Sequence, residues 1–238
     1  MRLIQWEKLP IEMQTEEVRK YYDILKKKKV GLFFKRIFDI VVSLLMLIIL
    51  SPVFLGLAIA IKLDSPGPVF YRQLRVTQYG KKFRIFKFRT MVQNADKIGA
   101  CVTIKGDSRI TKVGRFIRKT RLDEICQLLD VLRGTMTFVG TRPEAVKYVE
   151  AYTPEMLATL LLPAGVTSDA SIYYKSEAEL LEKAEDADKI YIEEILPTKM
   201  YYNLKSIEKF SFFGDIGIMF KTVFAVLGKE YKTGHREI

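Results

Sequence analysis

The sequence has few residues that ligate soft metals or form disulfides: its 238 residues include one histidine and two cysteines. Cys101 and Cys126 form no C-x-x-C pair, and His235 stands close to the C-terminal end, where we expect a tail. A structural zinc site needs about four such ligands at close spacing, so this chemistry is excluded. We interpret both cysteines as reduced thiols of a cytosolic compartment.

Acidic residues are also scarce relative to basic ones, with 28 aspartates and glutamates against 39 lysines and arginines, a formal net charge of +11. A chain this basic usually meets nucleic acid, anionic lipid or a phosphorylated substrate. The cations gather beside one apolar run and one acidic pair and form no nucleic-acid reading motif, so we expect no nucleic-acid partner. Because there is no internal repeat and no Gly/Ser linker, we expect one compact domain.

Charge is absent from one long stretch, Ile40 to Ile61. Its length is close to the ~20 apolar residues that cross a bilayer. It begins too far from the N-terminus, and lacks the small-residue cleavage site, for a signal peptide. A buried core helix is the alternative, but a chain of this size rarely hides so long an uncharged run. We therefore expect this stretch to enter a membrane.

The apolar run is interrupted near its middle by Ser51 and Pro52. Proline removes a backbone donor and clashes with the preceding turn, so the helix kinks or breaks there, and the Ser51 hydroxyl is available to a freed carbonyl. Both flanks are basic, and positive flanks favour the cytoplasmic side. We predict a re-entrant membrane hairpin over residues 35–63, rather than a spanning helix. The flanking cations are Lys26, Lys27, Lys28, Lys29, Lys35 and Arg36 before the run, and Lys62, Arg72, Arg75, Lys81 and Lys82 after it.

Before this hairpin we expect a basic helical extension over residues 1–34, with a helix over 12–29 that Thr15 caps. After it, residues 64–238 form the catalytic domain. Strands over 69–76 and 82–90, the second with clear alternation, meet at a Tyr79-Gly80 turn.

The rest of the chain is predicted to be mostly helical, with a loop-rich stretch over 91–110. A short helix is expected at 152–162, an acidic helix at 177–196 and a helical continuation at 199–208. Residues 210–227 form either a core helix or an amphipathic helix in the membrane interface. The predicted fold class is α+β: a mostly helical cytosolic domain with a short β-hairpin, seated on the membrane hairpin and interfacial helices.

One further helix carries the candidate chemistry. Its apolar face is Ile125, Leu128, Leu129 and Leu132. We predict Thr120 as its N-cap, with Asp123 three residues later as in a capping box, and Gly134 as its stop.

This helix start would place two adjacent carboxylates, Asp123 and Glu124, in its first turn. Unpaired amides and the helix dipole stabilise anions there, so we expect Asp123 to be ionised. Carboxylates ringed by cations suit metal-dependent phosphoryl transfer, although the acidic pair alone is more typical of an ordinary helix start. The nearby cations are Arg115, Arg118, Lys119 and Arg121 upstream, Arg142 on a proline-stiffened turn, and Lys87 and Arg89 at the end of the second strand.

The ordered set of motifs resembles the bacterial sugar transferase family, also called monotopic phosphoglycosyl transferases or polyprenyl-phosphate sugar phosphotransferases. The resemblance runs from about residue 33 to 228. The matching pieces are KRIFDI (35–40), the Ser51-Pro52 break, PGPVFYRQ (66–73), FKFRTM (86–91), SRITKVGRFIRKTRLDEICQLLDVLRGTM (108–136) and the Arg142-Pro143 turn.

The resemblance implies a catalytic dyad of Asp123 and Glu124, in which the aspartate attacks the β-phosphate of a UDP-sugar and UMP leaves. Polyprenyl phosphate then takes the phosphosugar from the aspartate. Mg²⁺ assists, with both carboxylates in its environment and Glu124 assigned chiefly to it. Arg118 and Arg142 are expected to clamp the diphosphate, and Lys87 is a further candidate.

The same resemblance implies a location on the cytoplasmic face of the bacterial inner membrane, in contact with membrane lipids, and a product that initiates a membrane-linked glycan. It leaves the sugar, the pathway and the oligomeric state open, a homodimer included.

The chain departs from the family pattern at PAGVTSDASIYY (163–174), where Gly165, Val166 and Thr167 are kept but the usual arginine and second glycine are not. Thr167 stays a substrate-binding candidate. This element is thought to shape the nucleotide-sugar pocket, so its change affects the choice of donor more than the reaction. Thr141 also replaces the proline that usually precedes the Arg-Pro turn. A catalytically inactive membrane-associated binding relative is the alternative function.

Overall fold

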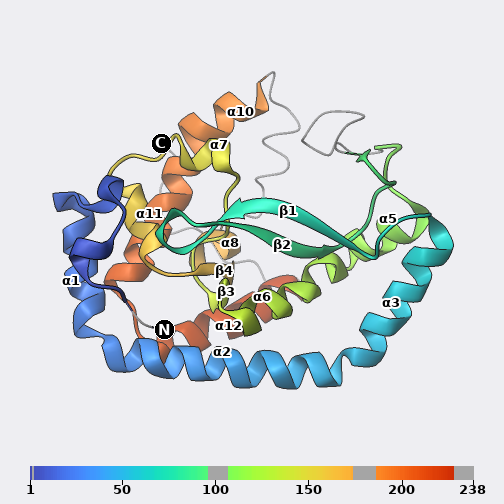
Figure 1. Ribbon diagram of the computed structural model, residues 1–238, viewed down its shortest axis with the longest axis horizontal. Helices are drawn as coiled ribbons and strands as arrows, with labels where there is room; N and C mark the ends of the chain where they lie inside the picture. Colours follow the sequence, from blue (N-terminus) through green and yellow to red (C-terminus); the bar gives the residue numbers. More distant parts are fainter. Residues whose placement is uncertain (2, 96–106, 174–185, 228–238) are drawn as a thin grey trace.

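In the computed structural model, which describes residues 1, 3–95, 107–173 and 186–227, helices surround two small sheets (Figure 1). The predicted α+β class is therefore confirmed. Cys101 and His235 lie outside the described residues, whereas Cys126 is a buried free thiol.

In the N-terminal part, two short 3₁₀ helices, η1 (Trp6–Lys8) and η2 (Ile11–Met13), precede three α-helices: α1 (Glu16–Lys27), α2 (Lys29–Ile49) and α3 (Ser51–Asp64). The predicted N-cap of α1 is confirmed, because the Thr15 hydroxyl accepts the Val18 N–H at 3.4 Å. Among the described helices, no single one is long and apolar enough to cross a membrane, but α2 and α3 together are, with a 60° bend between them. The pair forms the long angled rim of the molecule in Figure 1.

The bend lies where the sequence places the break. Pro52 has no N–H for the carbonyl of Ile48, four residues back, and the Ser51 hydroxyl donates to that carbonyl at 2.8 Å instead. Both helices expose many apolar side chains: Val30, Phe33, Phe34, Ile37, Val41, Leu44, Leu45, Ile48, Ile49, Val53, Leu55, Ile59 and Leu63.

Charged groups near the start of α2 join it to the domain. The Lys35 ammonium is buried, donates to the Val139 carbonyl at 2.7 Å, and pairs with Asp215 at 2.5 Å. The buried carboxylate of Asp39 accepts the Thr137 hydroxyl at 2.8 Å. These contacts fix α2 against the strand that leads into the Arg142 turn.

The predicted β-hairpin is confirmed as β1 (Phe70–Val76) and β2 (Lys82–Phe88), antiparallel, with Tyr71 opposite Lys87. Tyr79 and Gly80 both have positive φ, 58° and 71°, so the turn lies where it was predicted.

The predicted capping box at Thr120 is wrong. A helix already precedes this residue, α5 (Lys112–Lys119), with Thr111 as its N-cap. The Thr120 hydroxyl donates backward to the Phe116 carbonyl at 2.9 Å, which occupies it, and Arg121 turns the chain with a left-handed φ of 59°. The dyad then opens a short 3₁₀ helix, η4 (Leu122–Gln127), which continues into α6 (Leu128–Arg133). Gly134, with φ 85°, ends α6 as predicted.

A second sheet pairs β3 (Met136–Val139) in parallel with β4 (Ala164–Thr167). Around it lie η5 (Met156–Leu161), α7 (Val146–Val149), α8 (Asp169–Tyr173), α10 (Ala187–Ile190), η6 (Tyr191–Ile195, a π-helical turn), α11 (Leu196–Glu208) and α12 (Phe212–Val226). The helix predicted over 152–162 is thus a shorter 3₁₀ helix. Of the helices predicted over 177–196 and 199–208, residues 177–185 lie outside the described residues, and the chain from Ala187 to Glu208 is helical.

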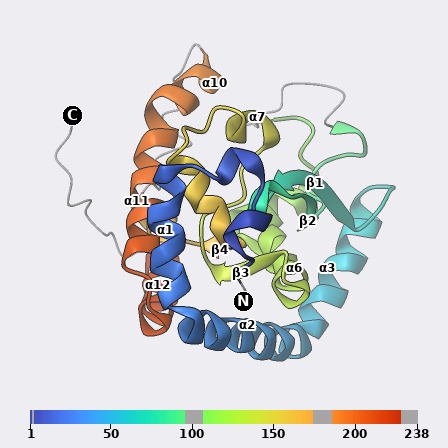
Figure 2. The ribbon, with the colours of Figure 1, turned by 60° about the vertical axis from the view of Figure 1, so that its left-hand side comes forward.

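Helix α12 lies beside α2 in both ribbon views (Figures 1 and 2). Phe213 is 79% exposed and Phe220 is 63% exposed, so α12 is not a core helix. Of the two interpretations of 210–227, the exposed aromatic face favours the interfacial one.

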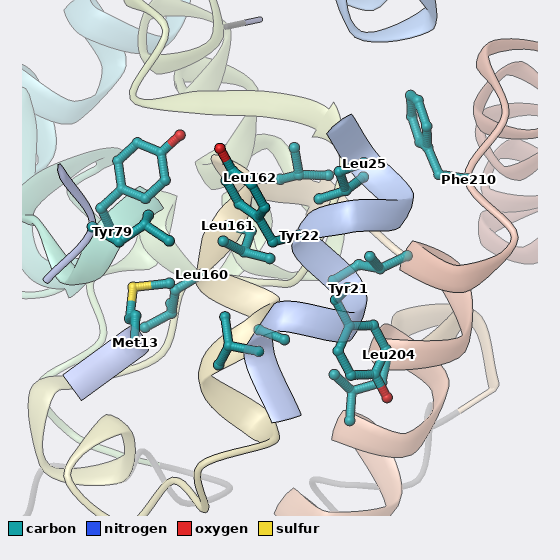
Figure 3. Close-up of a cluster of buried hydrophobic side chains, with 14 of the residues drawn as sticks. Met13, Tyr21, Tyr22, Leu25, Tyr79, Leu160, Leu161, Leu162, Leu204 and Phe210 are labelled. Carbon is teal, nitrogen blue, oxygen red and sulfur yellow. The ribbon is translucent and has the colours of Figure 1, made fainter. Parts of the chain in front are cut away.

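The N-terminal extension packs onto the domain around a large apolar cluster, shown in Figure 3. Tyr22 donates to the Ile4 carbonyl at 2.9 Å, and the Ile4 N–H donates to the Tyr79 hydroxyl at 3.1 Å, at the tip of the β-hairpin. The cluster joins α1, the hairpin tip, η5 and α11 through Met13, Tyr21, Tyr22, Leu25, Tyr79, Leu160, Leu161, Leu162, Leu204 and Phe210.

Candidate active site

The backbone of the acidic pair is packed against the core. Asp123 and Glu124 open η4, which packs against β2. The buried Cys126 thiol donates to the Asp123 carbonyl at 3.3 Å, and Cys126 belongs to an apolar cluster with Phe88 and Ile117. The backbone of the pair is therefore held by the core, while its carboxylates are only partly buried.

Two of the predicted cations converge on Glu124. Arg142, just beyond β3, pairs with its Oε1 atom, and the Lys87 ammonium from β2 lies 3.6 Å from the same oxygen. Three separate parts of the chain thus meet at one carboxylate. This arrangement fixes Glu124, and the Lys87 charge also acts on Asp123.

The two carboxyl groups titrate in opposite directions. Burial, and then the neighbouring Glu124 charge, raise the pKa of Asp123, with Lys87 as the largest opposing influence. Burial also acts to raise the pKa of Glu124, but Arg142 and Lys87 together outweigh it and hold that pKa below its ordinary value. The dipole of a full helix start would lower the pKa of Asp123, but η4 is a short 3₁₀ helix and burial raises that pKa instead.

Arg118 lies at the edge of this group. Its Nε atom donates to the Thr90 hydroxyl at 3.0 Å, and its charge lowers the pKa of Asp123 slightly. Arg89 has a different task. Its buried guanidinium donates to the Ser65 carbonyl at 2.7 Å and to that of Pro66, so it ties the end of α3 to the hairpin and does not serve the dyad.

Thr167 does not join the acidic pair in the described structure. It is buried at the end of β4, and its hydroxyl hydrogen-bonds that of Thr222 on α12 at 2.7 Å. Gly165, in the same strand, lies so close to Gly140 that an added Cβ would stand 2.1 Å from the Gly140 carbonyl oxygen. The altered element therefore supports the strand that precedes Arg142.

A buried cluster behind Arg142 was not predicted from the sequence. Glu144 accepts the Tyr191 hydroxyl at 2.6 Å and the Lys199 ammonium at 3.2 Å, and Lys199 also donates to Tyr191 at 2.8 Å. These partners come from η6 and α11, far along the chain. Because Glu144 is two residues after Arg142, the cluster anchors the turn that presents Arg142.

The donor set fits magnesium. In the part of the chain that the structure describes, no group of three or more His, Cys, Asp and Glu side chains is placed to hold a metal. Mg²⁺ in phosphoryl-transfer sites commonly takes one or two carboxylates and completes its shell with substrate phosphates and water. Asp123 and Glu124 provide that number of carboxylates.

Comparison with known proteins identifies the family. The bacterial sugar transferase family matches residues 30–229. The chain is 39% identical over 201 residues to the UDP-glucose:undecaprenyl-phosphate glucose-1-phosphate transferase of Klebsiella pneumoniae, covering 82% of this chain and 40% of that protein.

Two further relatives have different names. The UDP-N-acetylgalactosamine-undecaprenyl-phosphate N-acetylgalactosaminephosphotransferase of Aeromonas hydrophila is 36% identical over 198 residues, 82% of this chain and 44% of its own. The undecaprenyl-phosphate galactose phosphotransferase of Salmonella typhimurium is 33% identical over 218 residues, 85% of this chain and 42% of its own. The chain thus spans about two fifths of the length of these relatives. From the extent of these matches, the chain belongs to the bacterial sugar transferase family.

Proposed function

We propose that the protein transfers a sugar-1-phosphate from a UDP-sugar to a polyprenyl phosphate, undecaprenyl phosphate in bacteria, and releases UMP. An Asp123 carboxylate oxygen attacks the β-phosphorus, and the bond from that phosphorus to the bridging oxygen breaks, so UMP departs with the electron pair. An oxygen of polyprenyl phosphate then attacks the same phosphorus and frees Asp123. The product is the first lipid-linked sugar of a membrane glycan.

The observation that carries this proposal is the ion pairing of Glu124 with Arg142 and Lys87 beside Asp123. Glu124 is occupied by cations, so Asp123 is the carboxylate left to act as the nucleophile. In this proposal Arg142 and Lys87 neutralise phosphate oxygens, and Arg118 adds positive charge at the rim. Mg²⁺, when bound by Asp123 and Glu124, would supply further neutralisation of the diphosphate.

The membrane is the proposed location of the lipid acceptor. The 60° bend between α2 and α3, their exposed apolar side chains and the basic residues on both flanks favour a re-entrant hairpin that keeps both ends at the cytoplasmic face. In a cysteine-free background, single cysteines at Lys29 and Lys62 should be labelled by an impermeant reagent from the same side. Labelling from opposite sides would contradict the re-entrant path.

The reaction itself is tested by UMP release. Detergent-purified full-length protein is incubated with Mg²⁺ and a panel of UDP-sugars, with and without undecaprenyl phosphate. We expect multiple turnovers with one donor only when the lipid is present, and loss of turnover in Asp123→Asn. No release with any donor would favour the inactive binding relative, and unchanged turnover in Asp123→Asn would exclude Asp123 as the nucleophile.

A further inference from the structure

Arg75 is a cation of the β-hairpin that the sequence analysis did not connect with the dyad. Tyr71 lies opposite Lys87 in the strand register, and Arg75 is four residues beyond Tyr71 along β1. Because side chains alternate between the two faces of a strand, Arg75 shares the hairpin face of Lys87. Its side chain is half-buried there.

The chain around Arg75 leads to Arg142. The N–H of the next residue, Val76, donates to the Glu144 carbonyl at 3.1 Å, which brings the turn carrying Arg142 against the end of β1. Arg75 also interacts electrostatically with Arg142 and Glu144, and more weakly with Lys87 across the hairpin face. Arg75, Lys87 and Arg142 therefore form one group of cations on the side of the hairpin that faces Glu124.

This group has more positive charge than the nearby carboxylates balance. Glu144 already takes the Lys199 ammonium, and Glu124 takes both Arg142 and Lys87. Among the described residues, the guanidinium of Arg75 donates one hydrogen bond, at 3.1 Å to the carbonyl of its neighbour Leu74. Most of its five N–H donors thus remain available to the oxygens of a multiply charged acceptor.

We propose that Arg75 is a further substrate-binding residue, which holds the diphosphate of the nucleotide-sugar donor together with Lys87 and Arg142. The inference rests on the proposed function and names a residue for its donor site. Of the two phosphate sources in that reaction, the position favours the nucleotide. Phe70 begins β1, shortly after the end of α3, which belongs to the proposed membrane hairpin. Arg75 is five residues farther along β1, about 17 Å from Phe70 in an extended strand, so it lies away from the membrane that would hold the lipid phosphate.

The test compares Arg75→Met with Arg84→Met in the full-length protein. Arg84 is an exposed residue of the same hairpin and lies on its opposite face, across from Leu74. We expect Arg75→Met to raise the KM for the UDP-sugar about tenfold or more, as for loss of a charge-assisted hydrogen bond, with kcat and the KM for undecaprenyl phosphate little changed. Arg84→Met should match the wild type.

A second measurement distinguishes a loss of UDP binding from a loss of folding. UDP binding is followed by calorimetry for wild type, Arg75→Met and Arg75→Lys, each with an unfolding scan. Arg75→Lys, which keeps the charge without the planar fork, should bind UDP with intermediate affinity. An unchanged donor KM and UDP affinity in a folded Arg75→Met would overturn the inference, as would a rise only in the KM for the lipid. Wild-type protein that binds UDP but releases no UMP would contradict the proposed function. The UDP affinity of Arg75→Met relative to wild type would then still decide whether Arg75 binds the diphosphate.

Discussion

Replacing Lys199 by methionine should destabilise the protein strongly, although this residue is far from the dyad in sequence. The side chains of Lys199 and Glu144 are 7% and 10% exposed, so the ion pair is buried. The substitution leaves the Glu144 carboxylate in place with the Tyr191 hydroxyl as its remaining partner from the cluster. Removing one partner of such a pair costs about 3–5 kcal/mol, because the other charge stays buried.

For a chain of this length, that loss corresponds to a fall in Tm of roughly 6–20 °C. The assay is thermal unfolding in detergent for Lys199→Met, Glu144→Gln and the double variant. The double variant should recover part of the loss, because it removes the buried charge as well as its partner. Lys205→Met, at an exposed position on the same helix, is the matched control and should change Tm little.

The kinetic consequence separates anchoring from plain destabilisation. Below its melting temperature, Lys199→Met should have a higher KM for the UDP-sugar, because the turn that presents Arg142 is less well fixed, whereas Lys205→Met should not. A Tm for Lys199→Met that equals the wild type, or a double variant that loses the sum of the two single losses, would contradict a buried ion pair between Lys199 and Glu144.

Two further effects follow from the titrations and the packing at the site. Because burial raises the pKa of Asp123, activity should fall on acidification at a higher pH than an ordinary aspartate would give, as a pH–rate profile can show. Ionised Asp123 opposes folding above its folded pKa, so Asp123→Asn should keep or raise Tm at neutral pH. Glu124 behaves in the opposite way: its ion pairs stabilise the folded protein above pH 4.5, and this stabilisation is lost as the pH falls through the lowered pKa of Glu124. Gly165→Ala should lower the free energy of unfolding by about 3 kcal/mol or more, because its Cβ would meet the Gly140 backbone. Gly217→Ala in α12, whose added Cβ would have nothing within 4 Å, should raise it by up to about 1 kcal/mol in the same unfolding assay. Equal Tm values for these two variants would contradict the packing.

The features predicted well from the sequence are those with local causes. Alternation and a turn pair define the β-hairpin, and Pro52 lies in the first turn of α3, directly after the break at Leu50. The Thr120 prediction failed for an equally local reason, a competing bond to the Phe116 carbonyl that a capping pattern does not reveal. Arg121 has a left-handed φ, which is uncommon for a residue with a side chain and gave no signal.

The site depends on contacts between distant parts of the chain. The periodicity of β2 or η4 does not show that Lys87, Glu124 and Arg142 meet, and the family resemblance supplied that expectation. The pairing of Glu144 with Lys199 joins segments 55 residues apart, so only the structure reveals it. Arg75 is different, because strand alternation and the predicted turn together would have placed it on the face of Lys87.

The covalent intermediate that we propose on Asp123 can be trapped and identified. Full-length protein is mixed with its UDP-sugar and Mg²⁺ without polyprenyl phosphate, quenched, and analysed by mass spectrometry of the peptides around the dyad. We expect a phosphosugar on Asp123, about one UMP released per protein, and discharge of the phosphosugar when the lipid is added. A phosphosugar on Glu124 or another residue, or full UMP release in Asp123→Asn, would contradict the proposal.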